Sequence, residues 1–332
     1  MENFDLLSIG DATIDTFMTP LESETLCRLD SKDCLIAFSY GDKIPVKNLE
    51  FTIGGNAANN AVGTKRLSIN TSIVLTLGQD SVGEMIVARL KEEGVDATYI
   101  IQQPGTTSNY STIINYSGER TIFVYHAPRS YEFPVKLPLA PWVYLTSMGE
   151  SFRPFYNHFI EWLAKNPSVK LVFNPGSWQL RGGYEAIKVV MDATYLIYVN
   201  REEAEKLTGF GESAGKERDL LIALNKIGPK ICVITDGGGG SFAYDSIDGK
   251  FFKAGILPVD AYERTGAGDA FGSGTLSALI HGKPLGEALL WGTCNSASVI
   301  GYTGSQKGLL KLNEMDSWLA RCKSSGVGVT QF

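Results

Sequence analysis

The sequence has few cysteines, no long apolar run and no cluster of basic residues, and each absence excludes a class of protein. Its five cysteines include no C-x-x-C pair, so neither a structural metal site nor a disulfide framework is expected. A reducing compartment fits this usage best, although the spacing leaves open whether Cys27 and Cys34 pair. No segment approaches the roughly 18 consecutive apolar residues that a membrane-spanning helix requires.

Charge is nearly balanced, because 30 Lys and Arg residues stand against 36 Asp and Glu residues and give a net charge of -6. Binding to nucleic acid depends on clustered Lys and Arg, so nucleic acid is not an expected partner. The first five residues hold two acids, whereas a secretion signal begins with a basic segment followed by an apolar one. We therefore expect a cytoplasmic protein with no membrane partner.

What the sequence does have is 332 residues, 44% of them hydrophobic, which suffices to bury a large core without disulfides. Short β-branched runs alternate with amphipathic stretches, a pattern typical of a parallel sheet with crossover helices. The runs predict strands at residues 6–9, 72–77, 142–146, 170–173, 195–199 and 231–235. The amphipathic stretches predict helices at residues 57–67, 84–93, 154–164, 185–191, 201–207, 219–226, 268–281 and 285–301. We expect an α/β fold with a doubly wound, mostly parallel sheet flanked by helices.

Two segments depart from this alternation. Residues 98–126 contain alternating apolar runs around Ser117 and Gly118, which predicts a β-hairpin. Residues 16–53 are rich in turn and strand signals and contain no long helical period. Because a lone hairpin is marginal in water, we expect strands from both segments to join into a small β-sheet lid. This lid would be inserted into a single domain that spans residues 1–332.

The most informative stretch is residues 263–274, where small residues lead into a helical pattern. Gly266, Ala267 and Gly268 leave unpaired backbone N–H groups at a helix start, and such an end binds anions. Asp269 follows in the first turn, where an acid is also an ordinary helix-start residue. The stretch alone fits an anion site and a simple helix start equally well, and the other motifs decide between them.

A second helix start is led by Gly54 and Gly55. Asn56 and Asn59 lie one turn apart and share a helix face, so both carboxamides could meet one polyol ligand. The alternative is a loop and cap of a buried, Ala-rich helix.

Two acidic residues, Asp11 and Asp15, follow the first predicted strand. Ligands of open α/β sheets bind outside the carboxyl ends of the strands. These carboxylates can therefore accept hydrogen bonds from hydroxyl groups, although Asp residues in such loops are also common helix caps.

Two further motifs follow predicted strands. Asn200 and Glu203 have the spacing of a capping box, or they hold water around Mg²⁺. Thr235, Gly237 and Gly240 belong to a glycine-rich run, which allows close approach to a nucleotide. No segment fits the G-x-x-x-x-G-K-[ST] pattern, and none fits G-x-G-x-x-G after the first strand. Walker-type and dinucleotide sites are therefore not expected.

In this order, the five motifs resemble the ribokinase-like, PfkB carbohydrate kinase family, over a span from Gly10 to about Gly308. The GGxxxN element at residues 54–59 and the TGAGD element at residues 265–269 match that family's two signatures. Their joint occurrence about 210 residues apart makes the resemblance specific.

The resemblance implies a role for each motif. Asp269 would be the base that takes a proton from the substrate hydroxyl, and the amides of Gly266, Ala267 and Gly268 would form the anion hole for the transferred phosphoryl group. The implied sugar-binding residues are Asp11, Asp15, Gly54, Gly55, Asn56 and Asn59. The implied ATP-binding residues are Asn200, Thr235, Gly237, Gly240 and Asn295, and Glu203 would hold Mg²⁺ through water.

The sequence departs from the family's pattern at one position that concerns ions, and it shares one further element that concerns the substrate. The family most often has Asp where Glu263 stands, and that Asp helps to shape a monovalent-cation site, so Glu263 leaves activation by K⁺ open. Residues 118–120 resemble a G-E-R element of several sugar kinases, whose lid residues reach the substrate. Arg120 is therefore either a contact for a carboxylate or phosphate of the substrate or a solvated residue of the strand edge.

The resemblance implies an ATP-dependent kinase that transfers the γ-phosphoryl group to a hydroxyl of a small sugar or sugar derivative. A nucleoside kinase of the same family is the alternative, because a hairpin rich in aromatic residues suits a base: Tyr110, Tyr116, Phe123 and Tyr125. A non-catalytic binding protein on this fold would be expected to lack the base or the anion-hole glycines, and both are present.

The lid also bears on assembly. One face of a small sheet would cover the active site, and the other would carry Ile113, Ile122 and Val124 or their neighbours, depending on register. An exposed apolar sheet face needs a cover, and related sugar kinases pair lid on lid. We therefore expect a homodimer through the lid.

Overall fold

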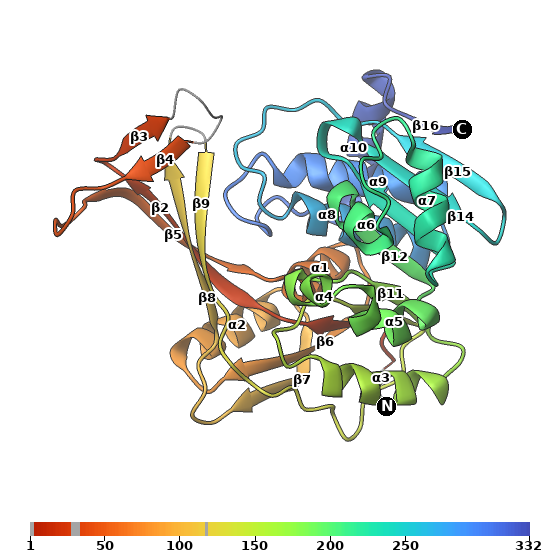
Figure 1. The fold of residues 1–332 in the computed structure, drawn as a ribbon, viewed down its shortest axis with the longest axis horizontal. Helices are drawn as coiled ribbons and strands as arrows, with labels where there is room; N and C mark the ends of the chain where they lie inside the picture. Colours follow the sequence, from red (N-terminus) through yellow and green to blue (C-terminus); the bar gives the residue numbers. More distant parts are fainter. Residues whose placement is uncertain (1–2, 28–33, 117–118) are drawn as a thin grey trace.

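The main sheet of the computed structural model, which describes residues 3–27, 34–116 and 119–332, confirms the predicted α/β fold (Figure 1). Its ten strands lie in the order β16-β15-β14-β13-β12-β11-β10-β1-β6-β7. The parallel strands are β1 (Leu6–Gly10), β6 (Thr71–Gly78), β7 (Asp96–Gln103), β10 (Trp142–Leu145), β11 (Lys170–Phe173), β12 (Leu196–Asn200) and β13 (Ile231–Thr235). An antiparallel edge is formed by β14 (Ser241–Asp245), β15 (Lys250–Ala254) and β16 (Val329–Gln331).

Each helix predicted from the sequence is present, within a few residues at its ends. They are α1 (Asn56–Arg66), α2 (Ser81–Glu92), α3 (Arg153–Ala164), α5 (Tyr184–Ala193), α6 (Arg201–Thr208), α7 (Glu217–Lys226), α8 (Ala267–Ile280) and α9 (Leu285–Val299). Two helices, α4 (Ser177–Gly182) and α10 (Leu312–Ser324), were not predicted. In the part of the chain that the structure describes, no helix has the length and apolar character needed to cross a bilayer.

A small sheet projects from the side of the molecule (Figure 1). Its order is β5-β2-β8-β9, formed by β5 (Val46–Gly54), β2 (Thr13–Pro20), β8 (Asn109–Tyr116) and β9 (Glu119–Tyr125). The predicted joining of two distant segments is therefore confirmed. The boundary at residue 98 is wrong, because β7 pairs in parallel with β6 of the main sheet. A single alternating strand gives the same sequence pattern in either sheet.

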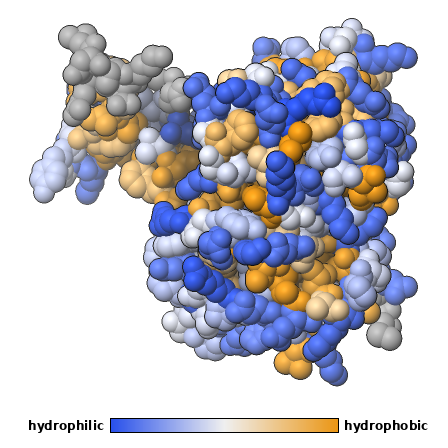
Figure 2. Space-filling view, turned by 45° about the vertical axis from the view of Figure 1, so that its right-hand side comes forward, coloured by the Kyte–Doolittle hydropathy of each residue, from blue (hydrophilic) through white to orange (hydrophobic). Residues whose placement is uncertain are grey.

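The two faces of the small sheet differ in their surroundings. Ser111 pairs with Asp15 on one side and Val124 on the other, so the three side chains share the face that lines a pocket. The opposite face carries apolar side chains that are about half exposed: Leu49, Phe51, Phe123 and Tyr125. Figure 2 shows apolar side chains gathered on this projecting part. The register therefore turns Ile113, Ile122 and Val124 inward, and their neighbours outward.

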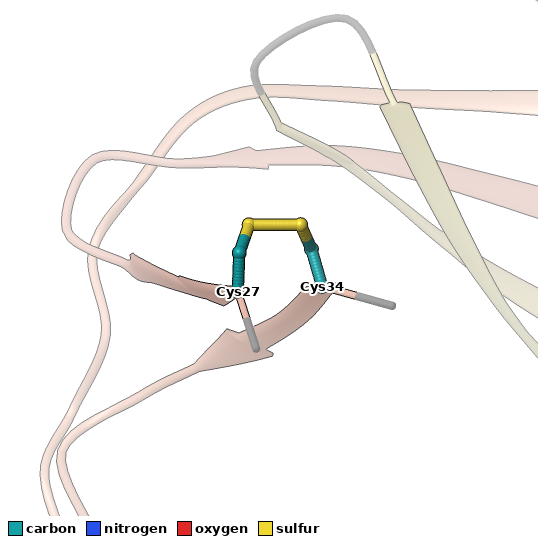
Figure 3. The surroundings of a disulfide bond; sticks show 2 residues. All are labelled: Cys27 and Cys34. Atoms are coloured by element: carbon teal, nitrogen blue, oxygen red, sulfur yellow. A yellow bond between two sulfur atoms is a disulfide. The ribbon is translucent and has the colours of Figure 1, made fainter. Parts of the chain in front are cut away.

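The cysteine expectation is corrected by the hairpin of β3 (Glu24–Cys27) and β4 (Cys34–Ala37). Cys27 lies opposite Cys34 in the antiparallel register, and a disulfide joins them (Figure 3). Cross-strand pairing brings their Cα atoms within 4.1 Å, a proximity that spacing alone did not reveal. The other cysteines, Cys232, Cys294 and Cys322, are free and buried.

Glycines let α8 and α9 pack closely beside the main sheet. A Cβ atom on Gly274 would lie 2.8 Å from the carbonyl oxygen of Trp291 and 3.1 Å from the Cβ atom of Asn295. Backbone atoms of a packed helix cannot yield as a flexible side chain can. This contact fixes the position of α8, which carries the candidate catalytic acid.

We predict that Gly274→Ala lowers the free energy of unfolding by about 1–3 kcal/mol, because the added methyl group overpacks the α8–α9 contact. Thermal unfolding followed by circular dichroism measures the change. Gly328→Ala is the matched control, since a Cβ atom there meets nothing within 4 Å. An equal loss of stability in both variants would contradict the packing explanation.

Candidate active site

The predicted site residues meet at one edge of the main sheet. Asp11 directly follows β1, and Asn200 and Thr235 end β12 and β13, where they are partners in the parallel register. Asp269 lies in the first turn of α8. This edge is formed by the carboxyl ends of the parallel strands, where open α/β sheets bind their ligands.

The start of α8 presents backbone amides to this edge. Gly266 is the N-cap residue, with a φ of 76°, and a Cβ atom there would lie 2.3 Å from the Cβ atom of Ser305. Only glycine fits both constraints. The amides of the first turn have no acceptor within the helix, and the helix dipole places partial positive charge beside them. The geometry is therefore suited to an anion.

Two carboxamides from α1 hold the carboxylate of Asp269. Asn56 Nδ2 donates to Oδ1 at 3.0 Å, and Asn59 Nδ2 donates to Oδ2 at 2.7 Å. Burial raises the pKa of Asp269, and the two amide donors offset part of that rise. The carboxylate is thus fixed in place, with a basicity above that of an exposed Asp.

The two asparagines share a helix face as predicted, but their surroundings differ. Asn59 is 3% exposed, and its Oδ1 atom accepts hydrogen bonds from Ser305 Oγ and Gln306 Nε2. Asn56 lines the pocket and accepts a hydrogen bond from Ser147 Oγ. Of the two, only Asn56 is placed to meet a ligand in that pocket, whereas Asn59 orients Asp269.

A cavity of about 220 Å³ lies between this edge and the small sheet. Its described lining residues are Asp11, Ala12, Thr13, Asp15, Gly55, Asn56, Asn109, Ser111, Ile113, Ile122, Val124, His126, Ser147 and Thr265. A wider depression of about 570 Å³ lies elsewhere, between Asn3, Asn70 and Asp96, and contains none of the predicted site residues. The smaller cavity is therefore the candidate substrate site.

Asp11 and Asp15 are the acidic residues of this cavity. The Tyr131 hydroxyl group donates a hydrogen bond to Asp11 Oδ2 at 3.0 Å. Burial raises the pKa of Asp11 to about 6, partly offset by Arg129 and Tyr131. Burial also raises the pKa of Asp15 to about 6, with repulsion from Asp269 and Glu263 adding to the rise. Gly54 leaves the room that the Asp15 carboxylate occupies.

The predicted nucleotide-binding residues border the same edge. Asn200 and Glu203 form a capping box, because Glu203 N donates to Asn200 Oδ1 at 2.8 Å and Asn200 N donates to Glu203 Oε2 at 2.9 Å. Burial raises the pKa of Glu203, and the Asn200 amide lowers it. Gly237 and Gly240 have φ angles of 46° and 86°, and Gly237 is exposed at the end of β13.

Asn295 is a correction to the predicted nucleotide site. It is 0% exposed, and its Nδ2 atom donates to the carbonyl oxygen of Ala270 at 2.8 Å. Its Oδ1 atom accepts the Leu310 amide at 2.9 Å. The carboxamide thus links α8 to the segment before α10 inside the core, where it is inaccessible to a nucleotide.

Arg120 also differs from its expected place. Its Nη1 atom lies 2.7 Å from Glu263 Oε1, so this arginine of β9 contacts the loop before α8 and is absent from the described pocket lining. Glu263 accepts the Thr265 amide at 2.7 Å and the Gly304 amide at 3.2 Å. The ion pair therefore connects the small sheet to the start of the anion-binding helix.

Several residues of the site were missed from the sequence. Asn109 and Ser111 alternate on β8 and face the pocket beside Asp15, and Tyr131 contacts Asp11. Polar residues two apart in an apolar strand indicate a polar patch on one face, and this was the one available signal for Asn109 and Ser111. Nothing in the local pattern marks Tyr131.

We predict that Asp15→Asn raises the melting temperature at pH 7.5, by the equivalent of about 1–3 kcal/mol. The folded-state pKa is raised from 3.8 to about 6, so ionised Asp15 costs stability above pH 6. The cost declines as the pH falls from 6 towards 3.8, and the two proteins should converge near pH 4. Exposed Asp42 supplies the control Asp42→Asn. A gain independent of pH would contradict the buried-charge explanation.

Known proteins match the chain along most of its length. The pfkB family carbohydrate kinase model matches residues 23–312. An ATP-dependent 6-phosphofructokinase of Thermoanaerobacterium thermosaccharolyticum is 26% identical over 317 residues, covering 92% of this chain and 90% of that protein. A ribokinase of Haemophilus influenzae is 26% identical over 277 residues, covering 81% and 88%.

Solved structures agree on the fold. Arabidopsis thaliana ribokinase, complexed with ribose and ATP, matches with a TM-score of 0.78 at 19% identity, covering 96% of this chain and 99% of that one. The family model, which spans most of the sequence, decides the classification. The chain belongs to the PfkB family of carbohydrate kinases and is a sugar kinase.

Proposed function

We propose that this chain transfers the γ-phosphoryl group of ATP to a hydroxyl group of a small sugar, with Asp269 as the base. The observation that carries the proposal is the place of Asp269. It lies in the first turn of α8, beside the anion-binding amides, and contacts Asn56 of the pocket lining. One residue thus adjoins both the hydroxyl that attacks and the phosphoryl group that is transferred.

Different groups accept the proton of the sugar hydroxyl and stabilise the charge of the transferred phosphoryl group. The Asp269 carboxylate accepts the proton of the attacking hydroxyl, and its raised pKa improves it as a base. The amides of Gly266, Ala267 and Gly268 stabilise the negative charge of the transferred group without reorganising. Phosphoryl transfer needs mainly this positioning and neutralisation.

Asn200, Thr235, Gly237 and Gly240 are the proposed contacts of ATP. Glu203 fits a water-mediated Mg²⁺ site, because Mg²⁺ retains several waters and needs only one or two carboxylates besides the phosphates. When bound, Mg²⁺ would neutralise phosphate charge. The residues around Glu263 do not fit a K⁺ site, because Arg120 and two backbone amides already engage the carboxylate oxygens of Glu263. No step through K⁺ is proposed.

The small sheet is the proposed lid, which excludes water from the transfer. Its inward residues Ile113, Ile122 and Val124 line the pocket on the same face of the sheet as Asp15.

The nucleoside alternative loses its support in this arrangement. Phe123 and Tyr125 project from the outer face of the small sheet. The hydroxyl group of Tyr110 forms a hydrogen bond with Thr16 Oγ1 at 2.6 Å. The hydroxyl group of Tyr116 donates a hydrogen bond to Ser23 O at 2.8 Å. None of these four aromatic residues belongs to the described lining of the pocket.

We predict that Asp269→Asn lowers kcat at least about a hundredfold, because it removes a positioned general base. The lost buried charge and the lost hydrogen bond to Asn56 or Asn59 change the melting temperature in opposite directions. Nucleotide affinity should change little, since the substitution keeps the size and shape of the side chain. A coupled assay of ADP release, with isothermal calorimetry for ATP, measures both. Asp260→Asn, at an exposed position before the motif, is the control. Turnover near that of the parent protein in Asp269→Asn would refute the proposal.

Glu203→Gln separates the metal role from the capping role. We expect the apparent Mg²⁺ affinity to fall about tenfold, while the capping hydrogen bonds, which Gln can also form, keep the melting temperature near that of the parent. Titration of activity with Mg²⁺ gives the affinity, and exposed Glu202→Gln is the control. An unchanged Mg²⁺ requirement would assign Glu203 to capping alone.

We propose that two chains pair through the outer face of the small sheet, because it exposes Phe51 at 54% and Phe123 at 59%. Light scattering should give about twice the chain mass of 36.1 kDa at micromolar concentration. Phe123→Asp should shift the mass to that of a monomer, whereas Ile247→Asp, at a residue 60% exposed elsewhere, should not. A monodisperse monomer of the parent protein would refute the dimer and leave the kinase proposal intact.

A further inference from the structure

The candidate substrate pocket combines two acidic side chains with an apolar roof. Asp11 follows β1 at the edge of the main sheet, Asp15 lies on the inward face of the small sheet, and both are less than 10% exposed. Ile113, Ile122 and Val124, on the same face of the small sheet as Asp15, form the roof. Among the described lining residues, none is a lysine or an arginine.

Two arginines that contact residues around the pocket are engaged elsewhere. Arg129 is 8% exposed, and its guanidinium donates to Thr107 O and Asn109 Oδ1, each at 3.0 Å, and to Thr76 O. Arg120 pairs with Glu263 at 2.7 Å. Both guanidinium groups therefore have protein acceptors and are not aimed into the cavity.

The one imidazole among the described lining residues adds no positive charge. Burial lowers the pKa of His126 below its usual value of 6.5, and nearby Arg129 lowers it further, so this side chain is neutral at pH 7. Asp11 and Asp15, with pKa values of about 6, are mostly ionised at that pH. With Asp269 beside them, the net charge around the pocket is negative.

We propose that the phosphoryl acceptor is a neutral sugar or polyol, carrying neither a phosphate nor a carboxylate group. The proposal rests on the proposed kinase function and names its substrate class. Hydroxyl groups can donate to the carboxylates of Asp11 and Asp15, and the C–H face of a sugar ring can pack against the roof. A buried anion would instead face carboxylates without a compensating cation.

This substrate class separates the chain from one of its relatives. The relative from Thermoanaerobacterium thermosaccharolyticum is a 6-phosphofructokinase, a name that specifies a phosphorylated sugar. A site for such a substrate requires Arg or Lys to meet its phosphate. The described pocket of this chain offers hydroxyl, carboxamide and carboxylate groups instead.

The test compares acceptors in matched pairs, with ATP and Mg²⁺: D-fructose with D-fructose 6-phosphate, and D-glucose with D-gluconate. We expect kcat/KM for the better neutral sugar to exceed that of its anionic partner at least about a hundredfold, from repulsion between charges a few ångströms apart. Equal or better transfer to an anionic acceptor would overturn the neutral class and leave the kinase intact.

Transfer to no acceptor would count against the proposed function, and binding then decides the substrate class separately. With the same sugars, thermal unfolding should show a larger rise in melting temperature for the neutral member of a pair. A larger or equal rise for the anionic member, or no rise for either, would overturn the inference.

A charge placed on the roof provides an independent variant. Val124 faces the pocket and is 55% exposed, so Val124→Arg can be accommodated without burying its guanidinium. We expect Val124→Arg to raise kcat/KM for the anionic acceptor, relative to that for its neutral partner, at least about tenfold. In the binding experiment, the rise in melting temperature should shift towards the anionic acceptor in the same way. Val135→Arg, at a fully exposed residue outside the pocket lining, is the control. An unchanged ratio in Val124→Arg would contradict electrostatic exclusion.

Discussion

Two hydrogen bonds between α1 and the carboxylate of Asp269 hold this site together. They join elements more than two hundred residues apart in the sequence. Asn59 in turn is held by Ser305 and Gln306, and Ser305 packs against Gly266. The anion-binding turn, its acid and the helix that orients the acid are therefore positioned by one continuous network of hydrogen bonds and close packing.

The same region gathers carboxylates that the fold would be more stable without. Asp11, Asp15 and Asp269 all have raised pKa values because they are buried. The acidic neighbours of Asp15 raise its pKa further. Stability lost in this way is expected at a site selected for chemistry. The rest of the main sheet is lined by apolar clusters on both faces, which offset that cost.

The sequence predicted those parts whose signal is local. Strands β1 and β10–β13 are nearly continuous apolar runs, as buried parallel strands are. Glycines mark the starts of α1 and α8. Features that depend on distant pairing were missed or misplaced. Whether β7 joins the main or the small sheet depends on its partner, and the inward turn of Val124 depends on the register with Ser111. Asn295 carried no local sign that its carboxamide is consumed by the core.

The ion pair between Arg120 and Glu263 makes the contact between β9 and the loop before α8 sensitive to ionic strength. Glu263 is well buried, with its side chain 6% exposed, whereas that of Arg120 is 36% exposed. Dissolved ions can therefore screen the arginine as it leaves the contact, while the carboxylate stays fixed by the Thr265 and Gly304 amides. The attraction between β9 and the loop before α8 is therefore stronger at low ionic strength than at high ionic strength.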